Sequence, residues 1–185
     1  MTELEREQAH FTLVQHGVSQ GLRVALVPGG KAFHLWPEER FAAVADSLVK
    51  DYGAQIIFFG SGNDIPMCQR VSALMKSKSL NLAGRTSLRE LIALLEAMDL
   101  VISNETGPMH LAVATGKPKV IALYGAADIV QYAPWGATGF MLTKGSKAEA
   151  YWDKVDYEQD CTKYLMQISI GEVCELAKTL LGCRV

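Results

Sequence analysis

Residues 103–110 (Ser-Asn-Glu-Thr-Gly-Pro-Met-His) carry the residue types best suited to chemistry in this chain. An apolar run precedes them and another follows, which predicts a buried strand, a tight polar turn and a helix. Proline suits the first helical turn because its missing N–H would have no partner there. The free N–H groups and positive dipole end of such a helix form a site for phosphate or carboxylate. We therefore expect Glu105, Thr106 and His110 to surround an anion-binding turn.

Two roles are open for Glu105. A carboxylate at a helix N-terminus commonly acts as a simple cap. If a ligand diphosphate occupies the N–H groups, the carboxylate must face elsewhere, and it is suited to accept hydrogen bonds from two sugar hydroxyls. Thr106 would then donate its hydroxyl and N–H to phosphate, and Gly107 would let a phosphate oxygen approach closely.

The standard nucleotide cradles are incomplete. Gly60 and Gly62 lie between a strand and a helix, but a dinucleotide fingerprint needs a third glycine where this chain has Ile65. Residues 116–118 read Gly-Lys-Pro, which breaks the P-loop pattern after its lysine. No serine lies in a Gly-x-Ser-x-Gly elbow, so Ser61 is expected to serve a turn. These patterns argue against NAD binding and against a serine triad.

The composition predicts one globular domain over residues 1–185, with 49% hydrophobic and 21% charged residues. A net charge of −2 provides no basic surface for nucleic acid. No apolar run reaches the roughly 20 residues of a membrane span, and the charged N-terminus lacks a signal-peptide core. The four cysteines show no metal-ligand spacing, which favours reduced thiols in a cytoplasmic protein over a disulfide framework or a zinc site.

Alternating apolar and helical patterns predict an α/β fold. Strands are expected at 22–27, 55–59, 80–82, 100–102, 120–124 and 140–142. Helices are expected at 2–18 (within an N-terminal helical segment, 1–21), from 36, at 66–76, from 87, from 107 and at 170–181. Residues 144–164 are polar and mixed, so the C-terminal region 144–185 is expected to be a meandering surface segment followed by a closing helix. This alternation is typical of a Rossmann-like, doubly wound parallel sheet.

Several polar loops should meet at one edge of this sheet. In open α/β sheets, ligands bind beyond the carboxyl ends of the strands. The loops at 28–36, 60–64, 84–87, 103–107 and 125–136 all follow strand ends on that side. His34 and His110 lie in or beside these loops, where each is as well suited to a structural hydrogen bond as to a ligand contact. Their convergence predicts one ligand site.

Residues 104–112 (Asn-Glu-Thr-Gly-Pro-Met-His-Leu-Ala) closely resemble the heptosyltransferases of glycosyltransferase family 9, whose usual pattern there is Asp-Thr-Gly-Pro-x-His-Leu-Ala. Further family motifs occur in order and at the expected spacing, at 28–29, 36–37, 60–64, 82–88, 116–118 and 123–125. The resemblance covers roughly residues 22–136, with a weaker echo at 161–173. The order of these motifs is far more specific than any one of them.

The resemblance implies the C-terminal half of a GT-B glycosyltransferase, the half that holds the nucleotide-sugar donor. The N-terminal half of the family, which binds the acceptor and carries the catalytic aspartate, has no counterpart in these residues, so no catalytic residue is expected here. The implied donor is ADP-L-glycero-D-manno-heptose, and the implied acceptor is the lipopolysaccharide inner core. The implied transfer is inverting and uses no metal and no cofactor, and peripheral membrane association of the whole enzyme is compatible with it.

Carried over residue by residue, the family pattern assigns donor contacts to ten positions: Gly29, Gly30, Lys31, His34, Asp64, Thr86, Glu105, Thr106, Gly107 and His110. Two of these depart from the family. His34 stands where the family usually has lysine, which leaves phosphate neutralisation to Lys31, and Glu105 stands where it usually has aspartate. Two alternatives stay open: a stand-alone nucleotide- or sugar-binding module without turnover, and another sugar-nucleotide enzyme such as an epimerase, against which the incomplete glycine fingerprint argues.

Overall fold

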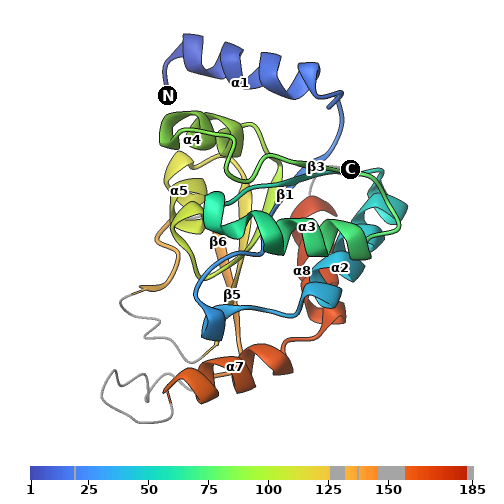
Figure 1. Cartoon of the computed structure of the whole chain (residues 1–185), viewed down its shortest axis with the longest axis vertical. Helices are drawn as coiled ribbons and strands as arrows, with labels where there is room; N and C mark the ends of the chain where they lie inside the picture. The colour runs from blue at the N-terminus through green and yellow to red at the C-terminus, as the bar shows by residue number, and fades with distance from the viewer. Residues whose placement is uncertain (19, 126–131, 137, 146–156, 183–185) are drawn as a thin grey trace.

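The computed structural model describes residues 1–18, 20–125, 132–136, 138–145 and 157–182. Its centre is a six-stranded, fully parallel sheet with the order β3-β2-β1-β4-β5-β6 (Figure 1). The strands are β1 (Arg23–Val27), β2 (Gln55–Phe58), β3 (Ser79–Asn81), β4 (Leu100–Asn104), β5 (Lys119–Tyr124) and β6 (Gly139–Thr143). The Rossmann-like, doubly wound α/β fold predicted from the sequence is therefore confirmed.

Helices lie before, between and after the strands along the chain. They are α1 (Glu3–Gln15), α2 (Glu38–Tyr52), α3 (Ile65–Leu74), α4 (Leu88–Glu96), α5 (Gly107–Thr115), α7 (Tyr157–Gln167) and α8 (Ile170–Leu181). Two 3₁₀ turns, η1 (Ala32–His34) and η2 (Gly62–Asp64), lie in the loops after β1 and β2. Within the described part of the chain, no helix is long and apolar enough to cross a membrane.

The order in which successive strands are added to the sheet reverses its direction at β1. From β1 the chain moves outward through β2 to β3, and α4 then returns it to the other side of β1, where β4 pairs with Val24 to Val27. The loops that leave the carboxyl ends of β1 and β4 consequently diverge to opposite faces of the sheet. A crevice opens at such a switch point, which is where open α/β sheets bind their ligands.

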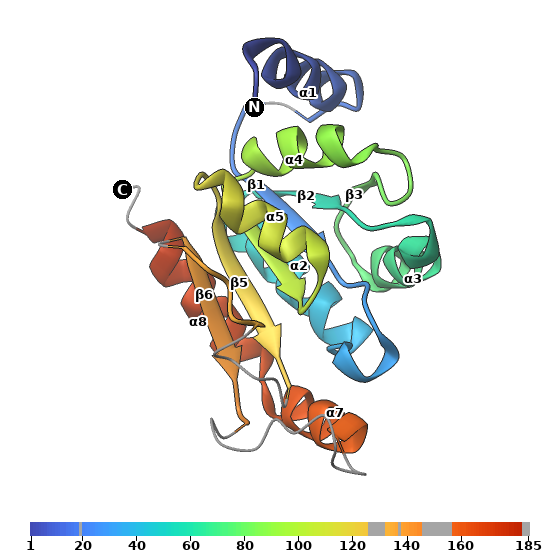
Figure 2. The same ribbon diagram turned by 90° about the vertical axis from the view of Figure 1, so that its left-hand side faces the viewer.

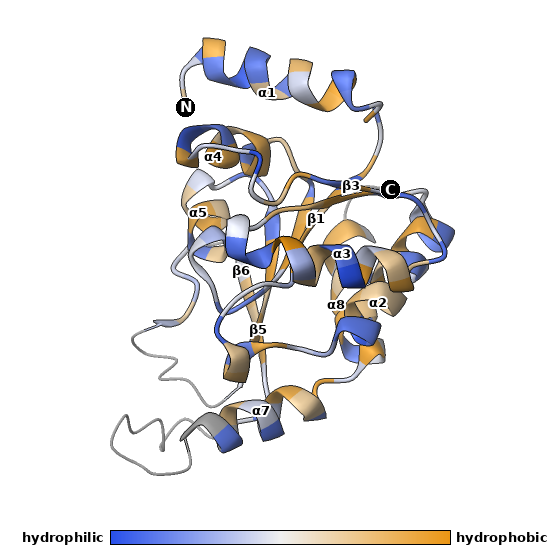
Figure 3. Ribbon diagram, in the orientation of Figure 1, coloured by the Kyte–Doolittle hydropathy of each residue, from blue (hydrophilic) through white to orange (hydrophobic). Residues whose placement is uncertain are grey.

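Alternate residues of each strand feed two hydrophobic layers, one on each face of the sheet. In β1, Val24 and Leu26 pack with α2, α3 and α8, whereas Ala25 and Val27 pack with α4 and α5. Figure 2 shows the sheet between these two helical layers, and Figure 3 shows apolar strands inside helices whose outward surfaces are polar. Because both faces are covered, the central strands read as continuous apolar runs.

The surface segment expected at 144–164 is wrong for residues 157–164. Its last part belongs to α7, in which Cys161 and Leu165 are fully buried. This helix packs beside η1 and β5 at the carboxyl edge of the sheet (Figure 1). The apolar spacing of Cys161, Leu165 and Ile168 is helical, but the polar residues between them obscure it. Residues 146–156 of the expected segment lie outside the described residues.

Candidate functional site

A cavity of about 530 Å³ opens where β1 and β4 end, at the switch point of the sheet. This volume lies within the range of roughly 300–1,000 Å³ that is usual for small-molecule sites. The loops after β1, β2 and β4 build it together, although they are far apart in the sequence. Its lining residues are Val27, Gly29, Gly30, Lys31, His34, Ser61, Asn63, Asp64, Glu105, Thr106, Gly107, Pro108 and Tyr132.

Helix α5 begins in this cavity without a side-chain cap. The N-termini of α1, α4 and α8 are each closed by a capping box, in which a serine or threonine and a glutamate bind the first N–H groups, whereas α2 and α3 start without a side-chain cap. The N-cap residue of α5, Thr106, makes no such hydrogen bond, and its hydroxyl instead lies 3.1 Å from that of Ser103. Pro108 occupies the first turn, as expected. The positive end of α5 is thus left for an anion.

Two glycines allow the loops after β1 and β2 to approach each other. A Cβ atom on Gly29 would lie 2.2 Å from Oδ1 of Asp64, and one on Gly60 would lie 2.7 Å from the Cβ of Asp64. Asp64 itself is fixed, because its Oδ2 accepts hydrogen bonds from the N–H and hydroxyl of Ser61. The cradle around Asp64 therefore depends on the absence of side chains at both glycines.

Asn104 anchors the loop after β1 at both of its ends. Its side chain is fully buried, donates from Nδ2 to the carbonyl of Pro28 at 2.7 Å, and accepts at Oδ1 from the N–H of Trp36 at 3.1 Å. The indole of Trp36 in turn donates to the carbonyl of Ile168 at the end of α7. A single β4 side chain thereby satisfies two buried main-chain groups of the loop, as buried polar groups require.

His34 and Glu105 meet inside the cavity. Nδ1 of His34 lies 2.9 Å from Oε2 of Glu105, and the two side chains are only 8% and 13% exposed. Burial, together with the negative charge of Glu105, raises the pKa of the Tyr124 phenol well above its usual range. The hydroxyl of Tyr124 donates to the carbonyl of Tyr132, which lines the same cavity. Glu105 is therefore not a cap of α5, because its carboxylate faces the loop after β1.

Lys31 is an exposed, positively charged side chain at the cavity. Among the residues that the structure describes, no group of three His, Cys, Asp or Glu side chains could hold a metal ion. On the other side of the cavity, burial and the charge of Asp64 raise the pKa of the Cys68 thiol to about 12. Cys68 is a free cysteine without exposure to solvent, so it remains a neutral thiol at neutral pH. The arrangement is suited to binding a polar anion and not to thiol chemistry.

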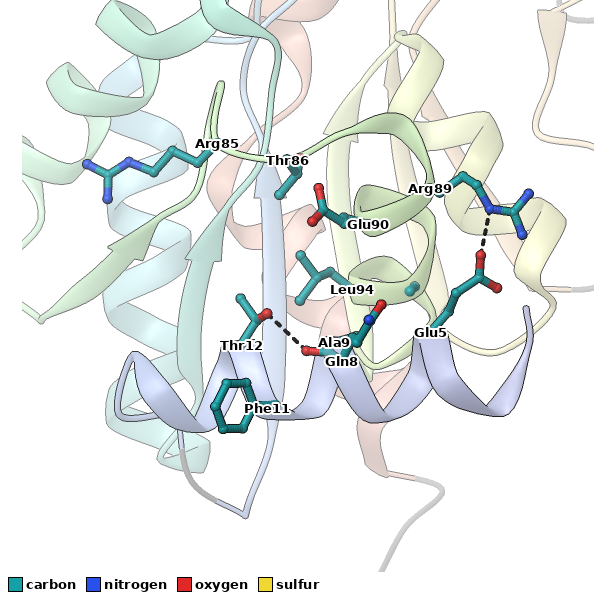
Figure 4. Close-up of a pocket in the computed structure, with 11 residues that line it drawn as sticks. Glu5, Gln8, Ala9, Phe11, Thr12, Arg85, Thr86, Arg89, Glu90 and Leu94 are labelled. Carbon is teal, nitrogen blue, oxygen red and sulfur yellow. Dashed lines mark hydrogen bonds and ion pairs between the residues drawn. The ribbon is translucent and has the colours of Figure 1, made fainter.

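Eight of the ten residues predicted to contact a donor line this one cavity. The two others lie elsewhere: His110 is exposed on α5 outside the lining, and Thr86 lines a second cavity of about 440 Å³ between α1 and α4 (Figure 4). In that second cavity Arg89 of α4 pairs with Glu5 of α1 at 2.5 Å, which helps to lower the pKa of the Glu5 carboxyl to about 2. Donor roles for all ten residues stay predictions, and the cavity supports them for the eight that line it.

Some site residues were not predicted. Asn63 and Tyr132 line the cavity, and Asn104 anchors its loop, although the sequence predicted no role for any of the three. A buried asparagine at the end of an apolar strand is itself a signal, because it must find hydrogen-bond partners in the next loop. No comparable signal marks Asn63 or Tyr132.

The sequence model of glycosyltransferase family 9 (heptosyltransferase) matches residues 2–162. The chain belongs to this family. Lipooligosaccharide heptosyltransferase 2 of Haemophilus ducreyi is 35% identical over 160 residues, which are 80% of this chain and 44% of that protein. Lipopolysaccharide heptosyltransferase 2 of Escherichia coli is 34% identical over 129 residues, or 63% of this chain and 36% of that protein. The chain thus spans less than half the length of these two relatives.

Solved structures of the same family share the fold. A glycosyltransferase family 9 structure from Veillonella parvula matches 98% of this chain and 52% of its own, with 28% identity and a TM-score of 0.80. The structure of Escherichia coli ADP-heptose lps heptosyltransferase II matches 99% of this chain and 53% of its own, with 24% identity and a TM-score of 0.79. The α/β fold is therefore that of about half of a family member.

Proposed function

We propose that this chain binds the nucleotide-sugar donor ADP-heptose for inverting transfer of heptose to the inner core of lipopolysaccharide. The family membership supports the reaction class. The uncapped start of α5 inside the switch-point cavity is the observation that carries the donor role, because a diphosphate needs N–H donors that no side chain already occupies. The reaction belongs on the cytoplasmic side, where nucleotide sugars are made.

In this proposal the diphosphate lies on Thr106 and Gly107. Their N–H groups and the Thr106 hydroxyl donate to phosphate oxygens, and Lys31 adds positive charge from across the cavity. The same contacts stabilise the charge that develops on the diphosphate as the sugar leaves, so they serve both binding and transfer. Oε1 of Glu105 accepts hydrogen bonds from sugar hydroxyls, while Oε2 stays on His34.

We assign no catalytic base to this chain. The acceptor and the base belong to an N-terminal half that these residues do not include, so we expect the chain alone to bind the donor without transferring the sugar. The alternative is a stand-alone nucleotide- or sugar-binding module without turnover. The two are separated by adding an N-terminal half from a family member and measuring heptosyl transfer.

Isothermal titration of the chain with ADP and ADP-heptose tests the proposal. We expect both to bind, and we expect Thr106→Val and Glu105→Ala to weaken binding, since each removes a predicted contact. Glu105→Ala should weaken ADP-heptose more than ADP, because its Oε1 is assigned to the sugar. Thr179→Val and Glu175→Ala, on the exposed surface of α8, are matched controls that should bind as the parent does. Failure of both ligands to bind the parent chain would refute the proposal.

A further inference from the structure

The two departures from the family pattern face each other in the structure. His34 and Glu105 are 71 positions apart in the chain, yet Nδ1 of one lies 2.9 Å from Oε2 of the other. Relative to a lysine, histidine brings its nitrogen two atoms closer to the main chain. Relative to an aspartate, glutamate carries its carboxylate one methylene farther. The shorter basic side chain thus meets the longer acid in this chain.

Burial makes this contact expensive to break. Both side chains are close to fully buried, and a carboxylate without a partner is strongly unfavourable in such a place. Replacing either residue alone lengthens or removes the contact between the two side chains. The two positions should therefore change together, and either single replacement should be worse than the joint one.

His34 of this pair belongs to the loop at 28–36, which lines one side of the cavity. Asn104 fixes the two ends of this loop, at Pro28 and Trp36, but its middle lies between those anchors. His34 ends the turn η1 in that middle part, and its N–H donates to the carbonyl of Lys31 at 2.8 Å. A tie between His34 and Glu105 consequently sets where Lys31 lies relative to the start of α5.

We propose that Glu105 is a positioning residue, which acts through His34 to hold loop 28–36 in the conformation that receives the donor diphosphate, and that the two residues form one exchangeable unit. This inference rests on the proposed function for its ligand. A loop that is already ordered loses less entropy when the ligand binds, so the pair contributes affinity even to a ligand that lacks the sugar. That sets the inference apart from a role in sugar recognition alone.

The test is a double-mutant cycle with ADP as the ligand, on the full 185-residue chain. We expect His34→Lys and Glu105→Asp each to weaken ADP binding by about tenfold or more, because each changes the close contact between the two buried side chains. The joint variant H34K/E105D should recover most of that loss. The cycle Glu7→Gln and His10→Gln, with the same residue types exposed on α1, should change nothing. Additive losses in the joint variant would overturn the inference.

A second measurement does not need a ligand. Amide hydrogen exchange of residues 29–36 should accelerate in each single variant and return toward the parent rate in H34K/E105D, while exchange in β1 and β4 stays slow. Unchanged exchange in the single variants would overturn the inference even if ADP binds. If the parent chain binds no ADP, the proposed function fails, and the exchange data still decide whether the pair holds the loop.

Discussion

Asn104→Ala is the substitution with the most directly calculable effect. The Asn104 side chain is fully buried and supplies the partners of two main-chain groups, the Pro28 carbonyl and the Trp36 N–H. Alanine leaves both without a partner, at about 1–3 kcal/mol each, so the free energy of unfolding should fall by about 2–6 kcal/mol. That is a large part of the roughly 5–15 kcal/mol available to a typical domain.

Urea denaturation followed by circular dichroism measures this loss. With a slope of about 2 kcal/mol per M, the midpoint should fall by at least about 1 M. Asn104→Asp keeps the shape and the acceptor but removes the donor to Pro28, so it should lose stability too. Asn81→Ala is the control, because Oδ1 of Asn81 accepts a hydrogen bond from the N–H of Ala83 in a partly buried turn. A loss for Asn104→Ala no larger than that of the control would refute the anchoring role.

Three further predictions concern stability. Gly125→Ala should lower the melting temperature markedly, because the new Cβ would lie 2.3 Å from the main-chain oxygen of Cys161. If differential scanning calorimetry showed an unchanged melting temperature, the close packing of α7 on β5 would be contradicted. Arg40→Met should expose the α7–α8 junction to limited proteolysis, because Arg40 donates to the carbonyls of Met166 and Ile168 there, at 2.7 and 2.6 Å. A cleavage rate equal to the parent's would contradict this role of Arg40. Lys144 and the cap contacts lower the pKa of the Glu172 carboxyl to about 2, so the stability from its charge is present above pH 4.5 and is lost as pH falls toward 2. The Glu172→Gln variant should therefore melt at a lower temperature than the parent at pH 7, and the two melting temperatures should converge near pH 2. A difference in melting temperature that does not change with pH would contradict this.

Much of the fold follows from local patterns in the sequence. The strand at 100–104 and the helix after it were predictable because an apolar run ends in a polar turn with a proline. The meeting of loops 28–36 and 103–107 was predictable as well, because parallel strands bring their carboxyl ends to one edge. The family motifs then identified most residues of the cavity before any geometry was known.

The pairings inside the cavity were not predictable in this way. The sequence treated His34 and Glu105 as separate departures, since nothing local indicates that two residues 71 positions apart make contact. The anchoring by Asn104 is equally non-local. Thr86 was placed with the donor by motif order alone, yet the loop that carries it turns toward α1, where the second cavity lies. The order of the motifs predicts which loops lie near the site, but it does not predict which of their side chains line the cavity.

The two hydrophobic layers on either face of the sheet are completed at different times as the chain is synthesised from its N-terminus. The layer against α4 and α5 consists of residues up to Tyr124, together with the later Tyr132 and Met141 at its margin. The opposite layer is completed by residues of α7 and α8, among them Leu165, Val173 and Leu181. At roughly 5–20 residues per second, a ribosome needs several seconds to synthesise the chain from Tyr124 to Leu181. During that interval the residues of α7 and α8 that complete the second layer are not yet available, so this face of the sheet is the last to be covered.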